Sequence, residues 1–319
     1  MDRAVGAAVS ANALHALGRG FESLTAHHPA PAVPVHLQRM RILCVHAHFD
    51  DFEFVAAGTF ELFRRKHGAD LRAKVVVCTD GRSGHHWRTP AETARIRLEE
   101  QAAAAAIGGY EFERLARPDG RPFGEARLPS NDLLAALWKS IRAFEPDYLF
   151  CPPLPSDPRA GVHPDHITVA DAVRRVAYMI NVPHAFVDDY PEEARAEARW
   201  IRTPVILNTW DSYIGEGPGS VPDLVVDVAD SFDQIARQSW CHQSQIREWL
   251  PWVGRHGIDP VQTLDQWNVS LRRRMDAQRL ALGLGEGAPL EAFFLTSWGE
   301  PADWARLERD FPAFRRRSR

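Results

Sequence analysis

The chain has 319 residues, of which 45% are hydrophobic and 25% are charged, and its formal net charge is -4. This composition is typical of a globular protein with ample apolar material for a core. The net negative charge argues against nucleic-acid binding, which requires a positively charged surface. No apolar run approaches the ~20 residues that cross a bilayer. We therefore expect neither a nucleic-acid partner nor an integral membrane segment.

The first 38 residues differ in composition from the rest of the chain. They are rich in Ala, His and Pro and end in HHPAPAVPVH, which is typical of a linker. The start of the chain is weakly charged and has no convincing cleavage site, so we interpret residues 1–38 as an N-terminal extension rather than a signal peptide. Residues 39–319 then form a single domain.

Cysteine usage indicates a reducing compartment. The chain has four cysteines, and no two of them have CxxC spacing: Cys44, Cys78, Cys151 and Cys241. Buried, reduced thiols in a cytoplasmic protein are the simplest interpretation of this pattern.

From residue 40 the sequence alternates between strand and helix patterns. Apolar runs predict strands at 40–48, 73–81, 110–116 and 147–153. Periodic segments with charged or glycine-marked ends predict helices at 51–68, 90–109, 130–146 and from about 163 to 181. Such alternation implies an α/β fold with a Rossmann-like parallel sheet flanked by helices.

The sheet order predicts where a ligand binds. In a Rossmann-like order of 3-2-1-4, the first and fourth strands are neighbours, and ligands bind beyond their carboxyl ends. The glycine fingerprint GxGxxG is absent after the first strand, which argues against a dinucleotide. We take residues 40–181 as the core of the domain and 182–319 as a C-terminal elaboration.

The C-terminal elaboration has weaker patterns. Strands are expected at 204–210 and 222–230, and a helix at 231–250. Eight of the ten tryptophans lie from Trp200 onward. They could form a substrate wall or an oligomer contact, although core packing is the simpler use of tryptophan. The sequence gives no oligomeric state.

Two polar clusters follow the two strands that are predicted to be neighbours. The segment HFDD contains His48, Asp50 and Asp51, and the segment HPDH contains His163, Asp165 and His166. Either cluster alone could be a helix start or cap. Imidazoles and carboxylates that meet at one crevice suit Zn²⁺ or a similar divalent ion. The acid that does not bind the ion could then act as general base, and the remaining histidine as an electrophile or acid.

The motifs resemble those of the GlcNAc-phosphatidylinositol de-N-acetylase superfamily, also called PIG-L or LmbE-like deacetylases. AHFDDFE is similar to the family's AHPDD motif with its following Glu, and HPDH is intact. TDG after the second strand, IRLEEQAAAAAIG in the next helix and a later His-x-Ser-Gln element (242–245) also match. The resemblance covers roughly residues 40–295, and it is strong to 180.

The resemblance implies a role for each residue of the two clusters. His48, Asp51 and His166 would bind zinc, with Fe²⁺ or Co²⁺ as alternatives. Asp50 would be the general base. His163 would stabilise the oxyanion and protonate the leaving amine, and Asp165 would orient a neighbouring histidine.

Other residues have both a functional and a simpler interpretation. The resemblance places Arg97 against polar groups of the substrate, but an exposed helix arginine paired with Glu is the alternative. Asp119 could bind sugar hydroxyls or act only in its turn. His85 and His86 could contact substrate or lie on a loop surface. Phe49 stands where the family usually has proline, which puts the geometry of the rim in doubt.

The resemblance implies a zinc-dependent hydrolase that removes acetyl from an N-acetylated amino sugar or glycoconjugate. A related amidase acting on a larger N-acyl conjugate is one alternative. A non-catalytic, Rossmann-like binding domain with incidental histidines is the other.

Overall fold

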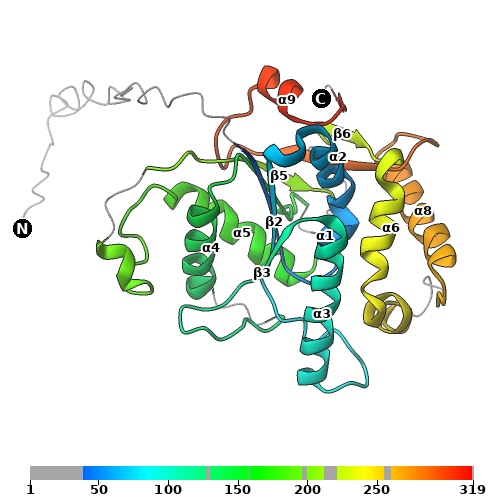
Figure 1. Ribbon diagram of the computed structural model, residues 1–319, viewed down its shortest axis with the longest axis horizontal. Helices are drawn as coiled ribbons and strands as arrows, with labels where there is room; N and C mark the ends of the chain where they lie inside the picture. Colours follow the sequence, from blue (N-terminus) through cyan, green and yellow to red (C-terminus); the bar gives the residue numbers. More distant parts are fainter. Residues whose placement is uncertain are drawn as a thin grey trace, which may run out of the picture. The chain divides into compact units, whose positions relative to one another are not determined.

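The computed structural model describes residues 39–126, 130–157, 159–195, 200–211, 221–254 and 260–317. The predicted N-terminal extension, residues 1–38, lies outside the described residues. The described strands form one mixed sheet in the order β3-β2-β1-β4-β5-β7-β6-β8, with helices on both faces (Figure 1).

The first five strands are parallel and confirm the predicted 3-2-1-4 order. Their bounds are β1 (Met40–His46), β2 (Leu71–Val77), β3 (Glu111–Arg114), β4 (Tyr148–Cys151) and β5 (Val205–Thr209). In β1, Leu43 pairs with Lys74 of β2 on one side and with Leu149 of β4 on the other. The carboxyl ends of β1 and β4 therefore lie side by side.

The remaining three strands extend the sheet in an antiparallel arrangement. They are β6 (Leu224–Asp227), β7 (Leu290–Leu295) and β8 (Phe314–Arg316). The strands expected at 204–210 and 222–230 are confirmed as β5 and β6. Sequence patterns predicted neither β7 nor β8.

Two hydrophobic cores cover the two faces of the sheet. Alternate residues of β1 point to opposite cores, Ile42 and Cys44 to one and Leu43 and Val45 to the other. The first core contains residues of α1 (Asp51–Val55), α2 (Ala57–His67), α3 (Pro90–Gly108), α6 (Phe232–Trp240) and α8 (Leu264–Ala281). The second contains residues of α4 (Ser130–Phe144) and α5 (Pro164–Met179). Figure 1 shows these two helical layers on either side of the sheet.

Several shorter helices complete the described fold. They are η1 (Gly68–Asp70), η2 (Pro191–Arg195), η3 (Ala229–Ser231), the π-helix η4 (Ser244–Trp249), α7 (Leu250–Val253) and α9 (Trp304–Asp310). None of the helices in the described part of the chain is long and apolar enough to cross a membrane.

Two predicted helices are interrupted. The helix expected at 51–68 breaks at Ala56, where φ is -149°, and α2 starts again with the backbone N–H groups of Gly58 and Thr59 donating to buried Glu291. The helix expected at 231–250 ends at Trp240 and continues as η4 and α7. The π-helical segment brings Gln245 and Trp249 to the cavity described below.

Candidate metal centre and active site

The turn between β1 and α1 holds Asp50 in an unusual conformation. Its φ is +80° and its ψ is -23°, in the left-handed region that residues other than glycine rarely adopt. Such a residue costs of order 1–3 kcal/mol and persists only where its surroundings hold it. Helix α3 provides those surroundings through Arg97 and Gln101, which lie one turn apart.

A buried hydrogen-bond network fixes the backbone of Asp50. Its N–H donates to Oε1 of Gln101 at 3.3 Å. The Nε2 of Gln101 donates to Oε1 of Glu53 at 3.0 Å and to the Tyr110 hydroxyl at 2.9 Å, and that hydroxyl donates to Glu53 at 2.7 Å. All three partners are buried. The backbone strain is therefore held by side chains from two other segments.

Arg97 holds the side chain of Asp50. It is only 3% exposed, which excludes the exposed-helix interpretation. Its Nη2 donates to Oδ1 of Asp50 at 2.9 Å and to the carbonyl of Phe49. Gly84 leaves room for the guanidinium, because a Cβ there would lie 2.6 Å from Nη1. Burial raises the pKa of Asp50 to about 6, and the charge of Arg97 opposes that rise.

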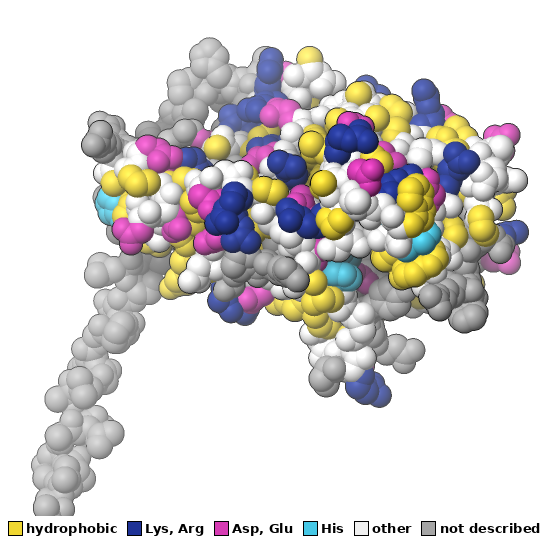
Figure 2. All heavy atoms as spheres, turned by 90° about the horizontal axis from the view of Figure 1, so that it is seen from below, with side chains coloured by type: hydrophobic (Ala, Val, Ile, Leu, Met, Phe, Trp, Pro, Cys, Tyr) yellow, Lys and Arg dark blue, Asp and Glu magenta, His cyan; other side chains and the backbone are white. Residues whose placement is uncertain are grey.

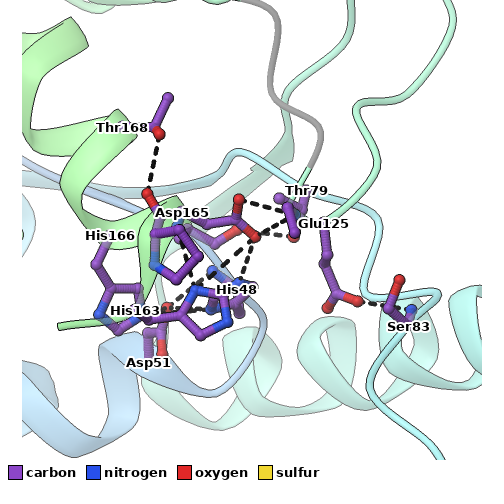
Figure 3. A network of polar contacts seen from close by, with 12 residues as sticks. His48, Asp51, Thr79, Ser83, Glu125, His163, Asp165, His166 and Thr168 are labelled. Atoms are coloured by element: carbon purple, nitrogen blue, oxygen red, sulfur yellow. Dashed lines mark hydrogen bonds and ion pairs between the residues drawn. The ribbon is translucent and has the colours of Figure 1, made fainter. Parts of the chain in front are cut away.

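Three ligand atoms from the two polar clusters form a nearly equilateral triangle. The Nδ1 of His48 lies 3.3 Å from Oδ2 of Asp51 and 3.3 Å from Nε2 of His166. The Nε2 of His166 lies 3.2 Å from the same Asp51 oxygen. Figure 3 shows these side chains converging from the β1–α1 turn and the start of α5.

Both histidines of the triangle are oriented by carboxylates on their outer sides. The Nε2 of His48 lies 3.1 Å from Oδ2 of Asp165, whose carboxylate also accepts the N–H of Ala126 at 2.8 and 2.6 Å. The Nδ1 of His166 lies 3.1 Å from Oδ2 of Asp211. A proton on each outer nitrogen leaves the inner lone pair facing the triangle, which is the usual support of a metal-binding histidine.

Charge separation is strong within this group when no metal is bound. Burial lowers the pKa of His48 and His166, but Asp51 and the outer carboxylates outweigh it and raise the two values to about 9 and about 10. For Asp51, burial opposes ionisation, yet the neighbouring histidines hold the pKa of its carboxyl well below the usual range. The ionised carboxylate of Asp51 therefore lies among the imidazoles of His46, His48 and His166.

His46 is the competing candidate ligand, since it lies with Asp51 and His166 in one compact group of possible donors. Its Nδ1 is 2.6 Å from Oδ2 of Asp51, which is a hydrogen-bond distance. Burial lowers the pKa of His46 and keeps the ring neutral. His46 therefore fits better as a hydrogen-bond donor to Asp51 than as a third ligand.

His163 both caps α5 and faces the site. Its Nδ1 accepts the N–H of Asp165 at 3.2 Å, so the helix-cap interpretation holds for that nitrogen. Burial and the nearby His48 and His166 lower the pKa of His163. The neutral ring then carries its proton on Nε2, which makes this atom a hydrogen-bond donor. The ring packs edge-on against His48, with centroids 4.6 Å apart.

These side chains line a cavity of about 520 Å³. Its polar lining includes His48, Asp50, Asp51, Arg97, His163, His166 and Asp211. Ser83 and Glu125 lie on its wall, and Ser83 donates its N–H to Glu125 at 2.6 Å (Figure 3). The structure thus brings Arg97 and the residues of both clusters to one place, with Asp165 behind them.

Other residues singled out in the sequence lie elsewhere. Asp119 is exposed in a turn, where it accepts from Arg121 at 2.7 Å, and it does not line the cavity. Its geometry supports only the turn interpretation. His85 lies 2.8 Å from Glu248, and His86 stacks on Trp252, so neither histidine lines this cavity.

Phe49 does not disturb the rim. The ring is fully buried and packs edge-on against Phe112, with centroids 6.0 Å apart. It also packs beneath Gly81, where a Cβ would lie 2.8 Å from the ring. The side chain of Phe49 therefore packs inside the protein and does not line the cavity.

Several residues of the site have no role that the sequence patterns predict. Asp211, Gln101, Glu53 and Tyr110 each act on a residue that is distant in sequence. The one available signal was the four-residue spacing of Arg97 and Gln101, which puts both on one face of α3.

Comparison with known proteins agrees with the motifs. Residues 43–177 match the family model of GlcNAc-PI de-N-acetylase. No curated protein sequence matches the chain. The N,N'-diacetylchitobiose deacetylase of Pyrococcus horikoshii has a similar structure, with a TM-score of 0.59, 19% identity and coverage of 81% of this chain and 84% of that one.

Two further structures show how widely the fold is used. The 4-carboxy-2-hydroxymuconate hydratase of Pseudomonas putida KT2440 has a TM-score of 0.55 and 18% identity, covering 81% of this chain and 96% of that one. The A40926 pseudoaglycone deacetylase has a TM-score of 0.52 and 16% identity, covering 82% and 100%. At these identities the likeness establishes the fold. The family match over residues 43–177 and the two motifs support the PIG-L/LmbE-like deacetylase superfamily for this chain.

Proposed function

We propose that this protein is a metal-dependent N-deacetylase that removes acetate from an N-acetylated amino sugar or glycoconjugate. The observation that carries the proposal is the triangle of His48 Nδ1, Asp51 Oδ2 and His166 Nε2 beside a separately held acid, Asp50. The family match supports the reaction, and the hydratase with the same fold shows that the fold alone does not fix it.

The donor set fits a small divalent ion. Tetrahedral ligands that bind zinc at about 2.0–2.1 Å lie about 3.3–3.4 Å from one another. The three measured separations are 3.2 and 3.3 Å. His48, Asp51 and His166 would hold the ion and leave a coordination position for water, and the same ligands also accept Fe²⁺ or Co²⁺. When bound, the ion lowers the pKa of water and polarises the acyl carbonyl.

Asp50 is the proton acceptor in this proposal. Its carboxylate lines the cavity but is held by Arg97 rather than by the histidines, so it is available to the attacking water. Its pKa of about 6 leaves it ionised at neutral pH yet basic enough to take a proton. The left-handed backbone and the bond to Gln101 fix where the carboxylate lies.

His163 is the hydrogen-bond donor in this proposal, and it lines the same cavity as Asp50. With Nδ1 accepting from the backbone, its Nε2–H is placed to donate to the oxygen of the acyl group as charge develops there. The proton that Asp50 takes from the water then passes to the departing nitrogen, while His163 keeps its Nε2 proton. Asp165 holds His48 and begins α5, so it positions two members of the site. One water is consumed, and acetate and a primary amine are released.

A screen of N-acetyl sugars with purified, metal-quantified protein tests this proposal. Free sugars, aryl glycosides and inositol-linked sugars should be compared, with acetate and new amine measured in equal amounts. Release of a different acid with the amine would favour the amidase alternative. A hydration reaction would release neither product, and fully metal-loaded protein that cleaves no amide would refute the proposal.

A further inference from the structure

The cavity has an apolar side that the proposed chemistry does not use. Its apolar lining residues come from α1, the end of β5, η4 and α7, and they are Phe54, Val55, Trp210, Trp249 and Leu250. All five are partly exposed. Phe54 and Val55 also pack against the first core, and Trp210 packs against a smaller cluster formed by Val225, Leu282, Leu290 and Ala292. Neither core packing nor amide hydrolysis accounts for Trp249 and Leu250, which belong to none of the hydrophobic clusters among the described residues.

Two of the tryptophans near this wall do not serve the protein core. Trp267 is buried in the first core, and Trp240 and Trp304 pack against it, which confirms core packing for part of the tryptophan-rich region. In contrast, Trp249 and Trp252 belong to none of the hydrophobic clusters among the described residues. They stack on each other, with centroids 5.2 Å apart and planes 27° apart.

This pair continues outward as an aromatic stack. His86 lies flat on Trp252, with centroids 4.7 Å apart and an interplanar angle of 4°. Trp252 is 41% exposed and the adjacent Val253 is 50% exposed. Apolar surface therefore runs from the cavity wall at Trp249 to the outside of the domain. Figure 2 shows that hydrophobic and histidine side chains also gather on the face seen there, among mixed charged groups.

The composition of the cavity indicates an amphipathic ligand. About 520 Å³ lies within the range of about 300–1,000 Å³ of pockets that take drug-sized ligands. One side presents the triangle, Asp50 and Arg97, and the other presents the apolar wall. The Phe54 ring is covered by the guanidinium of Arg274, 4.7 Å from its centroid. Trp249 and Leu250 are then the main apolar contacts left for a ligand.

We infer that the substrate carries an apolar substituent that packs on Trp249 and Leu250 while its N-acyl group lies at the triangle. This inference rests on the proposed function and names its substrate class as amphipathic N-acyl amino sugars. In the proposed deacetylase the apolar group is the aglycone, and an apolar acyl chain bound at the same wall would identify the amidase alternative instead. A free, unsubstituted N-acetyl sugar leaves the wall empty and is a poor substrate.

The test compares matched substrates in the full-length, zinc-loaded protein. Hexyl and methyl β-glycosides of N-acetylglucosamine test the aglycone, and N-hexanoyl and N-acetyl derivatives of one methyl glycoside test the acyl chain. Each buried methylene changes affinity by roughly a factor of four. With about half of the extra chain buried, kcat/KM should favour the hexyl or hexanoyl compound by about 10- to 30-fold.

Variants assign the preference to the wall. Trp249→Ala and Leu250→Ala should each reduce the hexyl-to-methyl or hexanoyl-to-acetyl ratio by at least about fourfold, the effect of one methylene. Trp200→Ala is the matched control, because Trp200 is 69% exposed and does not line the cavity. Ratios near one in the wild type, or unchanged by both wall variants, would overturn the inference and leave the proposed function standing.

Binding without turnover separates the two proposals. Calorimetry with hexyl β-glucoside, which has no amide, should give a Kd at least tenfold below that of methyl β-glucoside, and Trp249→Ala should remove the difference. If the protein shows this difference in Kd but cleaves no N-acetyl group, the role of Trp249 and Leu250 in binding an apolar group would stand and the deacetylase proposal would be refuted. A wild-type dimer that Trp249→Ala dissociates, with the substrate ratios unchanged, would make the wall an interface between copies and contradict the inference.

Discussion

Arg97 offers a sharp test of the roles assigned around Asp50. Replacing it in Arg97→Met removes the positive charge that lies 2.9 Å from the Asp50 carboxylate. Only His242 and His48 then oppose the effect of burial, so the pKa of Asp50 should rise above its present value of about 6. Loss of an opposite charge at this range typically shifts a pKa by about 1–3 units.

The expected size follows from the ionised fraction of Asp50. With a pKa of about 6, about 90% of the carboxylate is ionised at pH 7. A rise of about two units would leave about 10% ionised at that pH, so kcat/KM should fall about tenfold at pH 7 and recover by about pH 9. The acid limb of the pH–rate profile should shift to higher pH while the metal content stays constant.

The assay is the pH dependence of kcat/KM from pH 5 to 9.5. Metal content and the circular dichroism spectrum should be measured at both pH 5 and pH 9.5. Arg95→Met is the matched control, because Arg95 lies on the same helix but is 61% exposed and pairs with Glu99. Because Arg97→Lys keeps the positive charge, its acid limb should lie at a lower pH than that of Arg97→Met, closer to the wild-type position. An acid limb in Arg97→Met at the wild-type position would refute the role of Arg97 in setting the Asp50 pKa.

Three further predictions follow from the site. His163→Ala should keep its metal and lower kcat by about 10²-fold or more, as loss of an oxyanion donor does, and an unchanged kcat would reduce His163 to a helix cap. Asp51→Asn should lose metal, whereas Asp50→Asn should keep it and lose turnover; retention of metal and activity by both would contradict the division of roles. Zinc affinity should rise with pH, because His48 and His166 must each release a proton to bind the ion and have pKa values of about 9 and about 10. The Kd for zinc should therefore fall by up to about a hundredfold per pH unit between pH 7 and 9. A chelator competition that gives a pH-independent Kd would contradict those protonation states.

The parallel half of the sheet was predictable because its signals are local. The strands β1 and β4 are largely apolar, β2 ends in three valines, and the helices between them have clear periods and ends. The predicted order of the strands then places His48 and His166 at the same edge of the sheet. Two short motifs, 110 residues or more apart, needed only this topology to form one site.

In the antiparallel half β6 was predicted, but β7 was hidden by a charged residue in a buried position. In β7 the sequence LEAFFL contains Glu291, which breaks an otherwise apolar run. That carboxylate is 1% exposed and accepts the backbone N–H groups of Gly58 and Thr59 at the start of α2. Its role depends on a segment more than 230 residues away, and a local pattern carries no information about such a partner.

The outer parts of the site were hidden for the same reason. Asp211 follows β5 and reaches His166 across 45 residues, and Gln101 reaches Asp50 across 51. Asp211 lies in no motif, and the element IRLEEQAAAAAIG that contains Gln101 does not indicate which residue it contacts. The left-handed backbone of Asp50 was also unpredictable, because it results from these distant hydrogen bonds rather than from the identity of the residue.

The most direct test of the central claim is a zinc titration of the metal-stripped protein with acetate release as the readout. A substrate found in the screen should be used at saturating concentration. Acetate release should be absent without metal, rise linearly and reach a plateau at about one zinc ion per chain, and Asp51→Asn should stay inactive at the same zinc concentrations. Full acetate release from the metal-stripped protein, or from Asp51→Asn, would contradict a catalytic metal held by His48, Asp51 and His166.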